Sequence, residues 1–323
     1  MSENTPTGIL VLAYGTPEKP EDIEPYYTHI RGGRPPSPES LENLRERYRL
    51  VGGRTPLLDL SNGVADGLQA RLDQEAPGKY RVYLGMKHWH PYIGAVVPRI
   101  VADGVREVIA VVLAPHYSRY SLEGYRKYIN QALENVAPER RFGLNFIESW
   151  HEHPLFRQLI AGRITRALGE FPAGLRGQVR VVFSAHSLPE KIVAMGDPYP
   201  QQLRESAAGI AELLGLAQYG FCYQSAGMTG EPWLGPDILD YLPELHDQGV
   251  RAVLSVPFGF VAEHLEVLWD IDTEAAQKAD ELGMVLRRIR MPNADPEFVE
   301  VIQAVVADAD HRSLTTDHRP ANQ

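Results

Sequence analysis

The sequence predicts an α/β protein of two domains, each with a parallel sheet flanked by helices, and three observations support this prediction. Short apolar runs alternate with longer amphipathic stretches along the whole chain. Several apolar runs, such as VIAVVL and VRVVFS, are apolar on both faces, which is typical of parallel strands covered by helices on each side. The length of 323 residues favours two domains of roughly 100–200 residues over one open sheet.

The apolar runs and the amphipathic stretches between them predict the individual elements. Strands are expected at Ile9–Ala13, Tyr80–Gly85, Glu107–Leu113, Leu144–Ser149, Val179–Ser184, Tyr219–Tyr223, Ala252–Pro257 and Val285–Ile289. Helices are expected at Pro38–Leu50, Ala65–Gln74, Ile93–Ala102, Leu122–Val136, Pro154–Leu168, Gln201–Leu214, Pro236–His246, Leu265–Leu282 and Pro296–Ala307. Strands that alternate with helices form right-handed crossover units, so both sheets should be parallel.

The boundary between the domains is expected after the fourth strand, near His151–Pro154. Residues 1–150 then form an N-terminal domain and residues 151–308 a C-terminal domain. Residues 309–323 are mostly polar and include a proline, so we expect a flexible tail there.

The composition excludes several classes of protein. Acidic side chains outnumber basic ones by 42 to 32, which gives a net charge of −10 and argues against a nucleic-acid-binding protein. The single cysteine, Cys222, excludes an internal disulfide and an iron–sulfur cluster held by four thiolates of this chain. No apolar run is long enough for a membrane span, and Met1–Thr7 lack a secretory-signal pattern. We therefore expect a cytoplasmic protein.

Familiar cofactor and nucleophile motifs are missing from the sequence. It has no Gly-x-Gly-x-x-Gly fingerprint, phosphate-binding P-loop, Gly-x-Ser-x-Gly elbow or His-Glu-x-x-His pair. These absences argue against four classes of enzyme: dinucleotide oxidoreductases, nucleoside-triphosphate enzymes, common serine hydrolases and zincins. Attention therefore turns to polar residues at strand ends, because open parallel sheets bind ligands outside the carboxyl ends of their strands.

Two strand-end segments carry candidate catalytic groups. His186 follows the fifth expected strand directly, where its imidazole can fill a polar gap or act chemically. Glu266, Asp270 and Glu274 are spaced i, i+4 and i+8 on the eighth expected helix and share one face. Such a row is usually a solvated acidic face, but beside a binding crevice it can receive cations or pass protons. Imidazole with carboxylate is a plausible ligand set for Fe²⁺.

An arginine-rich segment follows the first strand. Between Tyr26 and Leu57 it contains Arg31, Arg34, Arg45, Arg47, Arg49 and Arg54. One interpretation is a solvated helix whose arginines pair with nearby glutamates. The other is recognition of carboxylates on a flat ligand, because a guanidinium binds a carboxylate through two parallel hydrogen bonds. The two interpretations are compatible.

Seven motifs in order along the chain resemble those of the ferrochelatase family, whose members insert ferrous iron into a porphyrin. They are LAYGTP (Leu12–Pro17), YYTHIRGGR (Tyr26–Arg34), LAPHYS (Leu113–Ser118), SAHSLPEK (Ser184–Lys191), GDPYP (Gly196–Pro200), PWLGPD (Pro232–Asp237) and VPFGFVAEHLEVLWD (Val256–Asp270). The resemblance runs along nearly the whole chain. It implies two Rossmann-like domains of the chelatase type, with a last helix that can pack back on the first domain.

The resemblance also implies roles for individual residues. His186 in SAHS and Glu266 in HLEVL match the catalytic and metal-binding residues on one side of the macrocycle. Asp270 and Glu274 would extend a path for the metal or for protons. The expected porphyrin contacts are Tyr14, Arg31, Arg47, Tyr48, Thr55 and Tyr125. Thr55 departs from the serine that is common at this position.

With a tyrosine at position 14, the sequence resembles the coproporphyrin III ferrochelatases of Gram-positive-type bacteria. That branch implies insertion of Fe²⁺ into coproporphyrin III to give coproheme in haem biosynthesis. Some family members carry an iron–sulfur cluster, but with one cysteine we expect none here and no other permanently bound cofactor. A downstream haem-synthesis enzyme is a candidate partner. The alternatives are a protoporphyrin IX ferrochelatase giving protohaem, a cobalt or nickel chelatase, and a non-catalytic tetrapyrrole carrier. An acidic helix face beside a histidine argues against the carrier.

Overall fold

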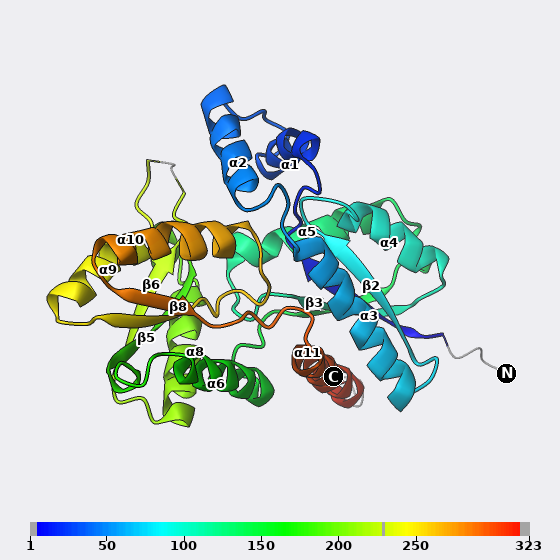
Figure 1. Ribbon diagram of the computed structural model, residues 1–323. Helices are drawn as coiled ribbons and strands as arrows, with labels where there is room; N and C mark the ends of the chain where they lie inside the picture. The colour runs from blue at the N-terminus through cyan, green and yellow to red at the C-terminus, as the bar shows by residue number, and fades with distance from the viewer. Residues whose placement is uncertain (1–4, 228–229, 317–323) are drawn as a thin grey trace.

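The computed structural model describes residues 5–227 and 230–316, and two four-stranded sheets form its centre (Figure 1). The first sheet has the order β2-β1-β3-β4 and the second the order β6-β5-β7-β8, with every neighbouring pair parallel. The strands are β1 (Thr7–Ala13), β2 (Tyr80–Met86), β3 (Glu107–Val112), β4 (Gly143–Ile147), β5 (Val179–His186), β6 (Tyr219–Gln224), β7 (Ala252–Val256) and β8 (Val285–Arg288). Each expected strand is present with small shifts at its ends, which confirms the predicted fold class.

Helices cover both faces of each sheet. Their bounds are α1 (Ile23–Ile30), α2 (Pro38–Leu50), α3 (Leu57–Glu75), α4 (Ile93–Ala102), α5 (Arg119–Glu134), α6 (Pro154–Gly169), α7 (Lys191–Ala194), α8 (Tyr199–Leu214), α9 (Ile238–Asp247), α10 (Ala276–Glu281) and α11 (Pro296–Thr316). Short 3-10 turns lie at Pro20–Asp22, Pro138–Arg140 and Arg176–Gln178, and Val267–Ala275 form a π-helix. Among residues 5–227 and 230–316, no helix combines the length and apolar character that crossing a bilayer requires.

The two halves share one hydrophobic core. Alternate residues of β1 point to opposite faces, so Ile9 and Val11 join this shared core while Leu10 and Leu12 pack under α4 and α5. The shared core continues through α3, α6, α8 and α11 and connects the two sheets. Helices α9 and α10, together with the π-helix, cover the other face of the second sheet.

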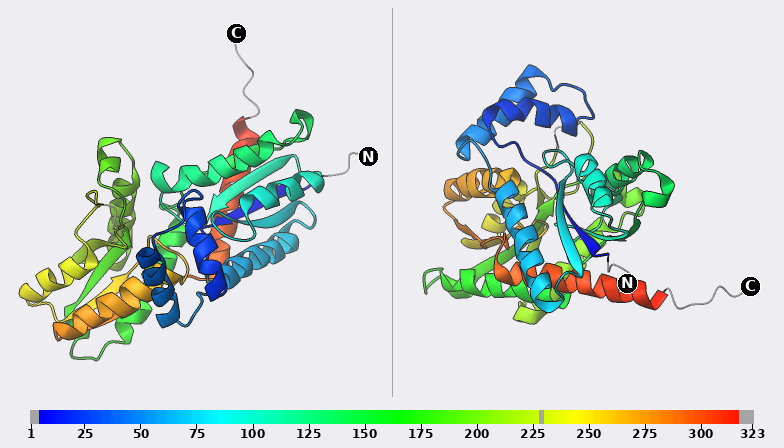
Figure 2. Two further views of the ribbon diagram at one scale, coloured as in Figure 1. Left: turned by 90° about the horizontal axis from the view of Figure 1, so that it is seen from above. Right: turned by 90° about the vertical axis from the view of Figure 1, so that its right-hand side faces the viewer.

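Part of the segment predicted to be a flexible tail, residues 309–323, is helical. Helix α11 continues through residues 309–316, and residues 317–323 lie outside the described part of the chain. It packs beside α3 of the first half (Figure 2). Arg71 donates to the Gln303 side chain at 2.6 Å, and the Tyr80 hydroxyl donates to Asp310 at 2.7 Å. These contacts and the buried Ala309 explain why a polar sequence remains helical here.

Helices α1 and α2 stand above the two sheets as a small unit, which we call the lip (Figure 1). Its core consists of Ile23, Leu41 and Tyr48. The sequence did not predict α1, because eight residues preceded by a proline-containing turn and followed by two glycines carry too few apolar positions for a periodic pattern. Packing of Ile23 against α2 stabilises it instead.

Candidate active site

A hollow lies between the lip and the second half of the chain, and three of the expected site residues line it. It encloses about 320 Å³. Arg47 of α2 lines one side, and the opposite side is formed by Ser225, Ala226, Asp237, Ile238, Leu239, Asp240, Asp270 and Glu274. Its position outside the end of β6 agrees with the rule that open parallel sheets bind ligands at the carboxyl ends of their strands.

His186 is the last residue of β5 and is held from several sides. Its Nδ1 contacts the carbonyl oxygen of Ser187, and because a carbonyl only accepts, Nδ1 carries a hydrogen. The buried Tyr199 hydroxyl donates to the His186 carbonyl oxygen at 3.0 Å. A Cβ on Gly259 would come within 2.6 Å of the Ala185 Cβ, so glycine lets this loop approach the strand closely. With Nδ1 held in this way, Nε2 is the ring nitrogen left for a ligand or a proton.

Glu266 lies beside a histidine that the sequence did not predict as part of the site. His264 donates from Nδ1 to the Ala262 carbonyl at 2.9 Å, and its Nε2 lies 3.1 Å from Glu266 Oε2. Burial lowers the pKa of His264, while the Glu266 charge partly offsets this effect. In the neutral ring Nε2 is an acceptor that faces a carboxylate, so a single proton held between the two atoms would give both a hydrogen-bond partner. The His-x-Glu spacing beside a strand end would have identified it.

The acidic row lies on a π-helix rather than the ordinary helix that the sequence predicts. Glu266 directly precedes the π-helix Val267–Ala275. In a π-helix the backbone hydrogen bonds join residues five apart, whereas in an α-helix they join residues four apart. Glu266 and Glu274 both raise the pKa of Asp270, so the three carboxylates act on one another. Short π segments occur often at functional sites.

Asp270 is the buried member of the row and connects it to the lip. Arg47 Nη1 lies 3.7 Å from Asp270 Oδ1, and the Ser225 hydroxyl donates to Oδ2. Ser225 adopts a left-handed conformation with φ of 65°, which is uncommon for a residue other than glycine. Burial raises the pKa of Asp270 to about 7, with further contributions from Glu266 and Glu274.

Replacing Asp270 by asparagine should alter the pH dependence of stability. An unfolded aspartate titrates near about 4, and the folded pKa is about 7, so the native carboxyl contributes stability at low pH that is lost as the pH rises through 7. Relative to wild type, Asp270→Asn should therefore gain on the order of 1–3 kcal/mol of unfolding free energy between pH 5 and pH 8. Urea unfolding at both pH values measures this change. Asp240→Asn, at an exposed position, is the control, and an effect independent of pH would contradict the prediction.

The expected porphyrin contacts fall into an open group and a buried group. Tyr14 follows β1 and is 40% exposed, whereas Tyr48 and Thr55 are each only 2% exposed. Thr16, which the sequence did not predict as part of the site, lies 3.2 Å from the Tyr48 hydroxyl and 2.8 Å from the Thr55 hydroxyl. Tyr125 on α5 is also buried. The hydroxyl groups of Thr16, Tyr48 and Thr55 therefore hold the base of the lip to the loop after β1.

Tyr14 and Glu266 belong to different halves of the chain and interact electrostatically. Although 40% of Tyr14 is exposed, the protein packed around its side chain excludes water and raises the pKa of the phenol, and the Glu266 carboxylate raises it further. Tyr14 is therefore a neutral phenol across from the acidic row. This arrangement brings together residues that lie at the ends of β1 and of the loop after β7.

Some arginines of this segment pair with nearby carboxylates and others do not, so both interpretations of the arginine-rich sequence apply. Arg45 pairs with Glu24, Arg49 with Glu46 and Arg54 with Asp59. Within residues 5–227 and 230–316, Arg31 and Arg34 have no carboxylate within ion-pair distance, and both are exposed. Arg31 and Arg34 are therefore available to an anionic ligand.

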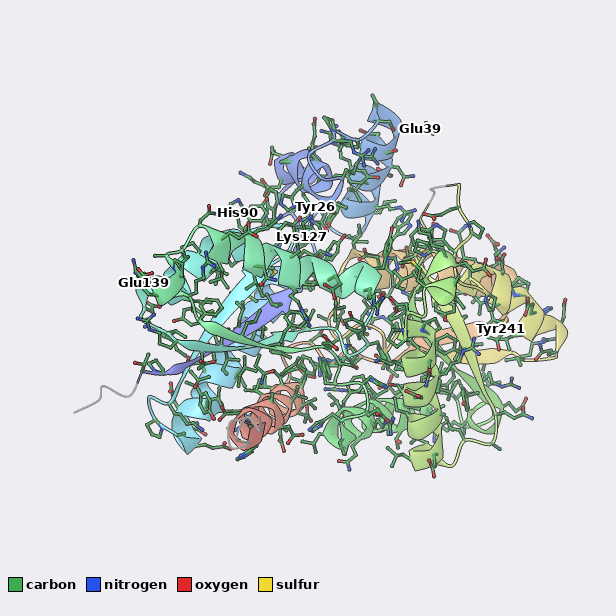
Figure 3. The ribbon with its side chains drawn as sticks, turned by 180° about the vertical axis from the view of Figure 1, so that it is seen from behind. Tyr26, Glu39, His90, Lys127, Glu139 and Tyr241 are labelled. Carbon is green, nitrogen blue, oxygen red and sulfur yellow. The ribbon has the colours of Figure 1, made fainter. Side chains whose placement is uncertain are left out.

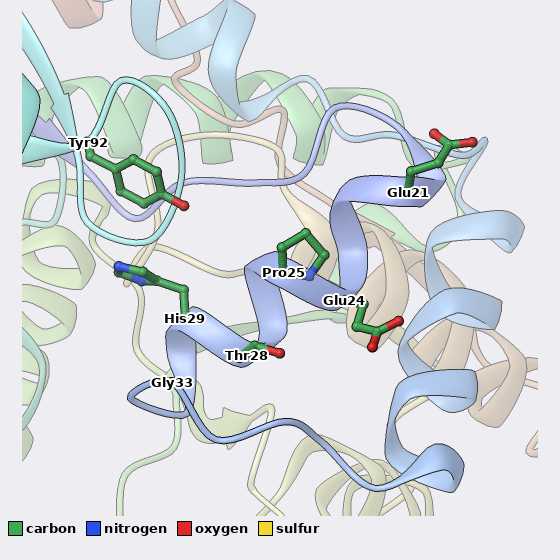
Figure 4. Close-up of a pocket in the computed structure, with 7 residues that line it drawn as sticks. All are labelled: Glu21, Glu24, Pro25, Thr28, His29, Gly33 and Tyr92. Carbon is green, nitrogen blue, oxygen red and sulfur yellow. The ribbon is translucent and has the colours of Figure 1, made fainter.

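A second hollow lies beside α1, where His29 approaches Tyr92 (Figure 4). Its walls are Glu21, Glu24, Pro25, Thr28, His29, Gly33 and Tyr92. None of the site residues expected from the sequence lines it. Three of them, Arg47, Asp270 and Glu274, line the hollow between the lip and the second half, whereas His186, Glu266 and Tyr14 line neither hollow.

The sequence profile of the ferrochelatase family matches residues 6–310. The chain belongs to the ferrochelatase family. A ferrochelatase of Herpetosiphon aurantiacus is 55% identical over 300 residues, covering 93% of this chain and 98% of that protein. A coproporphyrin III ferrochelatase of Anoxybacillus flavithermus is 45% identical over 301 residues, with coverage of 93% and 95%. The coproporphyrin III ferrochelatase of Bacillus subtilis is 42% identical over 301 residues, with coverage of 93% and 96%.

Solved structures agree on the fold of this ferrochelatase. SirB from Bacillus subtilis with Fe³⁺ aligns with a TM-score of 0.58 at 13% identity, over 96% of this chain and 98% of that chain. The Deinococcus radiodurans protein DR2241, described as structurally similar to chelatases, aligns with a TM-score of 0.53 at 14% identity, over 93% of this chain and 54% of that chain. At such low identities these structures support the fold alone.

Family membership establishes the reaction class. This ferrochelatase is a metal chelatase of the lyase class that acts on a porphyrin and iron in haem biosynthesis. Fe²⁺ is therefore a substrate that must reach the macrocycle.

Proposed function

We propose that this ferrochelatase inserts Fe²⁺ into coproporphyrin III to give coproheme. The observation that carries the proposal is the pair of exposed lip arginines, Arg31 and Arg34, that have no carboxylate partner in residues 5–227 and 230–316. Coproporphyrin III has four propionates, whereas protoporphyrin IX has two propionates and two vinyl groups. Guanidinium groups at the rim favour the substrate with more carboxylates. The names of the Anoxybacillus and Bacillus relatives support the same substrate.

In the proposed reaction, Fe²⁺ replaces two pyrrole N–H protons of the macrocycle. His186 offers its Nε2 lone pair, and the neighbouring Glu266 and His264 can hold one proton between them. These groups bind the incoming metal or accept the released protons from one face of the ring. Asp270 and Glu274 extend the anionic path along the π-helix, and Tyr14 supports the opposite face.

The rival substrate is protoporphyrin IX, because the relative at 55% identity is named only as a ferrochelatase. We expect coproporphyrin III to give the higher kcat/KM in anaerobic steady-state assays with Fe²⁺ and no detergent. Arg31→Gln should reduce kcat/KM for coproporphyrin III by about tenfold, whereas Arg49→Gln, whose arginine pairs with Glu46, should have little effect. A clear preference of the wild type for protoporphyrin IX would overturn the proposed substrate.

The proposed function includes no iron–sulfur cluster and no other permanently bound cofactor. Cys222, the single cysteine, is a fully buried residue of β6, and burial raises the pKa of its thiol. Such a thiol is a poor metal ligand, since the thiolate is the binding form. The purified protein should therefore show no cluster-type visible absorption and no acid-labile sulfide. Stoichiometric sulfide would contradict this expectation.

The proposal also includes a cytoplasmic location and transfer of coproheme to a downstream haem-synthesis enzyme. Both follow from the proposed product and from the expectations drawn from the sequence. A co-purification of this ferrochelatase with an enzyme that consumes coproheme would test the partner.

A further inference from the structure

Lys87 carries a charge that the proposed reaction does not use. It directly follows β2, and its backbone N–H donates to the Ala13 carbonyl at 2.9 Å, which holds it beside the end of β1. Its side chain crosses to α5, where Nζ donates to the Ser121 carbonyl at 2.9 Å. The ammonium lies 5.0 Å from the Tyr125 ring centre and 5.8 Å from that of Tyr14. It therefore lies next to two expected substrate contacts.

A glycine on α5 makes room for this ammonium. A Cβ on Gly124 would lie 2.6 Å from Cε of Lys87 and 2.8 Å from its Nζ. Glycine inside a helix costs about 1 kcal/mol relative to alanine, and here it accommodates the end of the lysine side chain. The position of the ammonium is therefore a built feature of the helix surface.

The charge of Lys87 has no counter-ion in the described residues. No carboxylate of residues 5–227 or 230–316 lies within ion-pair distance of Nζ. Burial lowers the pKa of Lys87 to about 8. A partly buried ammonium compensated only by one carbonyl and two aromatic rings is electrostatically unfavourable, and a carboxylate would compensate it far better.

We propose that Lys87 binds a carboxylate side chain of the tetrapyrrole and contributes to the selection of carboxylate-bearing porphyrins. The inference rests on the proposed function only in requiring a porphyrin with propionates. A macrocycle that contacts Tyr14 and Tyr125 brings its periphery within reach of the ammonium, which lies between their rings. The competing interpretation is purely structural, in which Lys87 only joins the loop after β2 to α5 through Ser121.

Among the titratable groups at this position, only Lys87 is expected to titrate near pH 8, because the groups that face its ammonium titrate far from that pH. They are the phenols of Tyr14 and Tyr125 and the imidazole of His88. Burial raises the pKa of both phenols and lowers that of His88 to about 3. Affinity for a carboxylate should therefore fall as the pH rises through about 8 and Lys87 loses its proton.

The test measures the dissociation constants of the wild type and of Lys87→Met between pH 6.5 and pH 9. Coproporphyrin III and protoporphyrin IX are titrated separately. Methionine keeps an unbranched side chain but removes the charge. We expect weaker binding by about tenfold or more at pH 6.5, and no decline of the variant's affinity with pH. Lys127→Met is the matched control, because Lys127 is an exposed lysine of α5, the helix that the Lys87 side chain contacts (Figure 3).

A second variant moves the charge without removing it. Gly124→Ala should displace the Lys87 ammonium and weaken porphyrin binding while helix α5 is kept or stabilised. Wild-type affinity in Lys87→Met, or a loss that leaves the pH profile unchanged, would overturn the inference. A wild type that prefers protoporphyrin IX would defeat the proposed substrate alone, since the propionates of that porphyrin still test Lys87.

Discussion

Replacing His186 by alanine should abolish metallation while the protein still folds and binds porphyrin. The substitution removes the acceptor nitrogen at the end of β5, but the backbone carbonyl that receives the Tyr199 hydrogen bond remains. A catalytic base or metal-delivery group contributes roughly 10²–10⁴-fold to a rate, so kcat should fall by at least about 100-fold. Single-turnover metallation measured by absorbance tests this prediction.

The control for this experiment is His246→Ala, at the end of α9. It should retain wild-type kcat and porphyrin affinity. Circular dichroism and the melting temperature establish that both variants are folded. A folded His186→Ala protein that kept more than a small fraction of kcat would exclude the assigned role.

Replacing Glu266 by glutamine should lower kcat by about 10- to 100-fold and change porphyrin affinity much less. Glutamine keeps the shape of the side chain but removes the charge that faces His264 Nε2 at 3.1 Å. The pair then loses its proton-binding capacity, because a neutral amide does not stabilise an imidazolium as a carboxylate does. Stopped-flow metallation together with equilibrium porphyrin titration separates the two effects.

Variants farther along the π-helix provide the comparison. Asp270→Asn and Glu274→Gln should mainly change the dependence of the rate on iron concentration, because these side chains line the hollow between the lip and the second half. Glu281→Gln, on α10 and paired with Lys278, should behave as wild type. If Glu266→Gln were fully active, the row would be a solvated acidic face without a catalytic role.

The sequence predicted the sheets well because the relevant information is local. Buried parallel strands such as β3 are continuous apolar runs, and a single run is sufficient to identify each one. The strand-end rule then located His186, and helical spacing located the acidic row, although it could not distinguish a π-helix from an α-helix. Assignment of Glu266 to the metal side came from the family resemblance.

Residues that join the site through distant contacts escaped prediction. Thr16, Lys87 and Ser225 each depend on partners from other elements: Thr55, Gly124 and Asp270. Their chemistry is visible only when the backbone places these partners together. Lys87 and Ser225 nevertheless follow strands, so a systematic inspection of every strand end would have included them.

The core that continues through α3, α6, α8 and α11 has a consequence for unfolding. Because the same apolar cluster includes strands of both sheets, neither sheet can lose its covering layer without exposing part of the other. The melting of the two halves is therefore thermodynamically coupled, and calorimetry should record one cooperative heat-absorption peak rather than two. Loss of α11 alone would remove Phe298, Ile302 and Val305 from that cluster, so its detachment would lower the thermal resistance of the entire molecule.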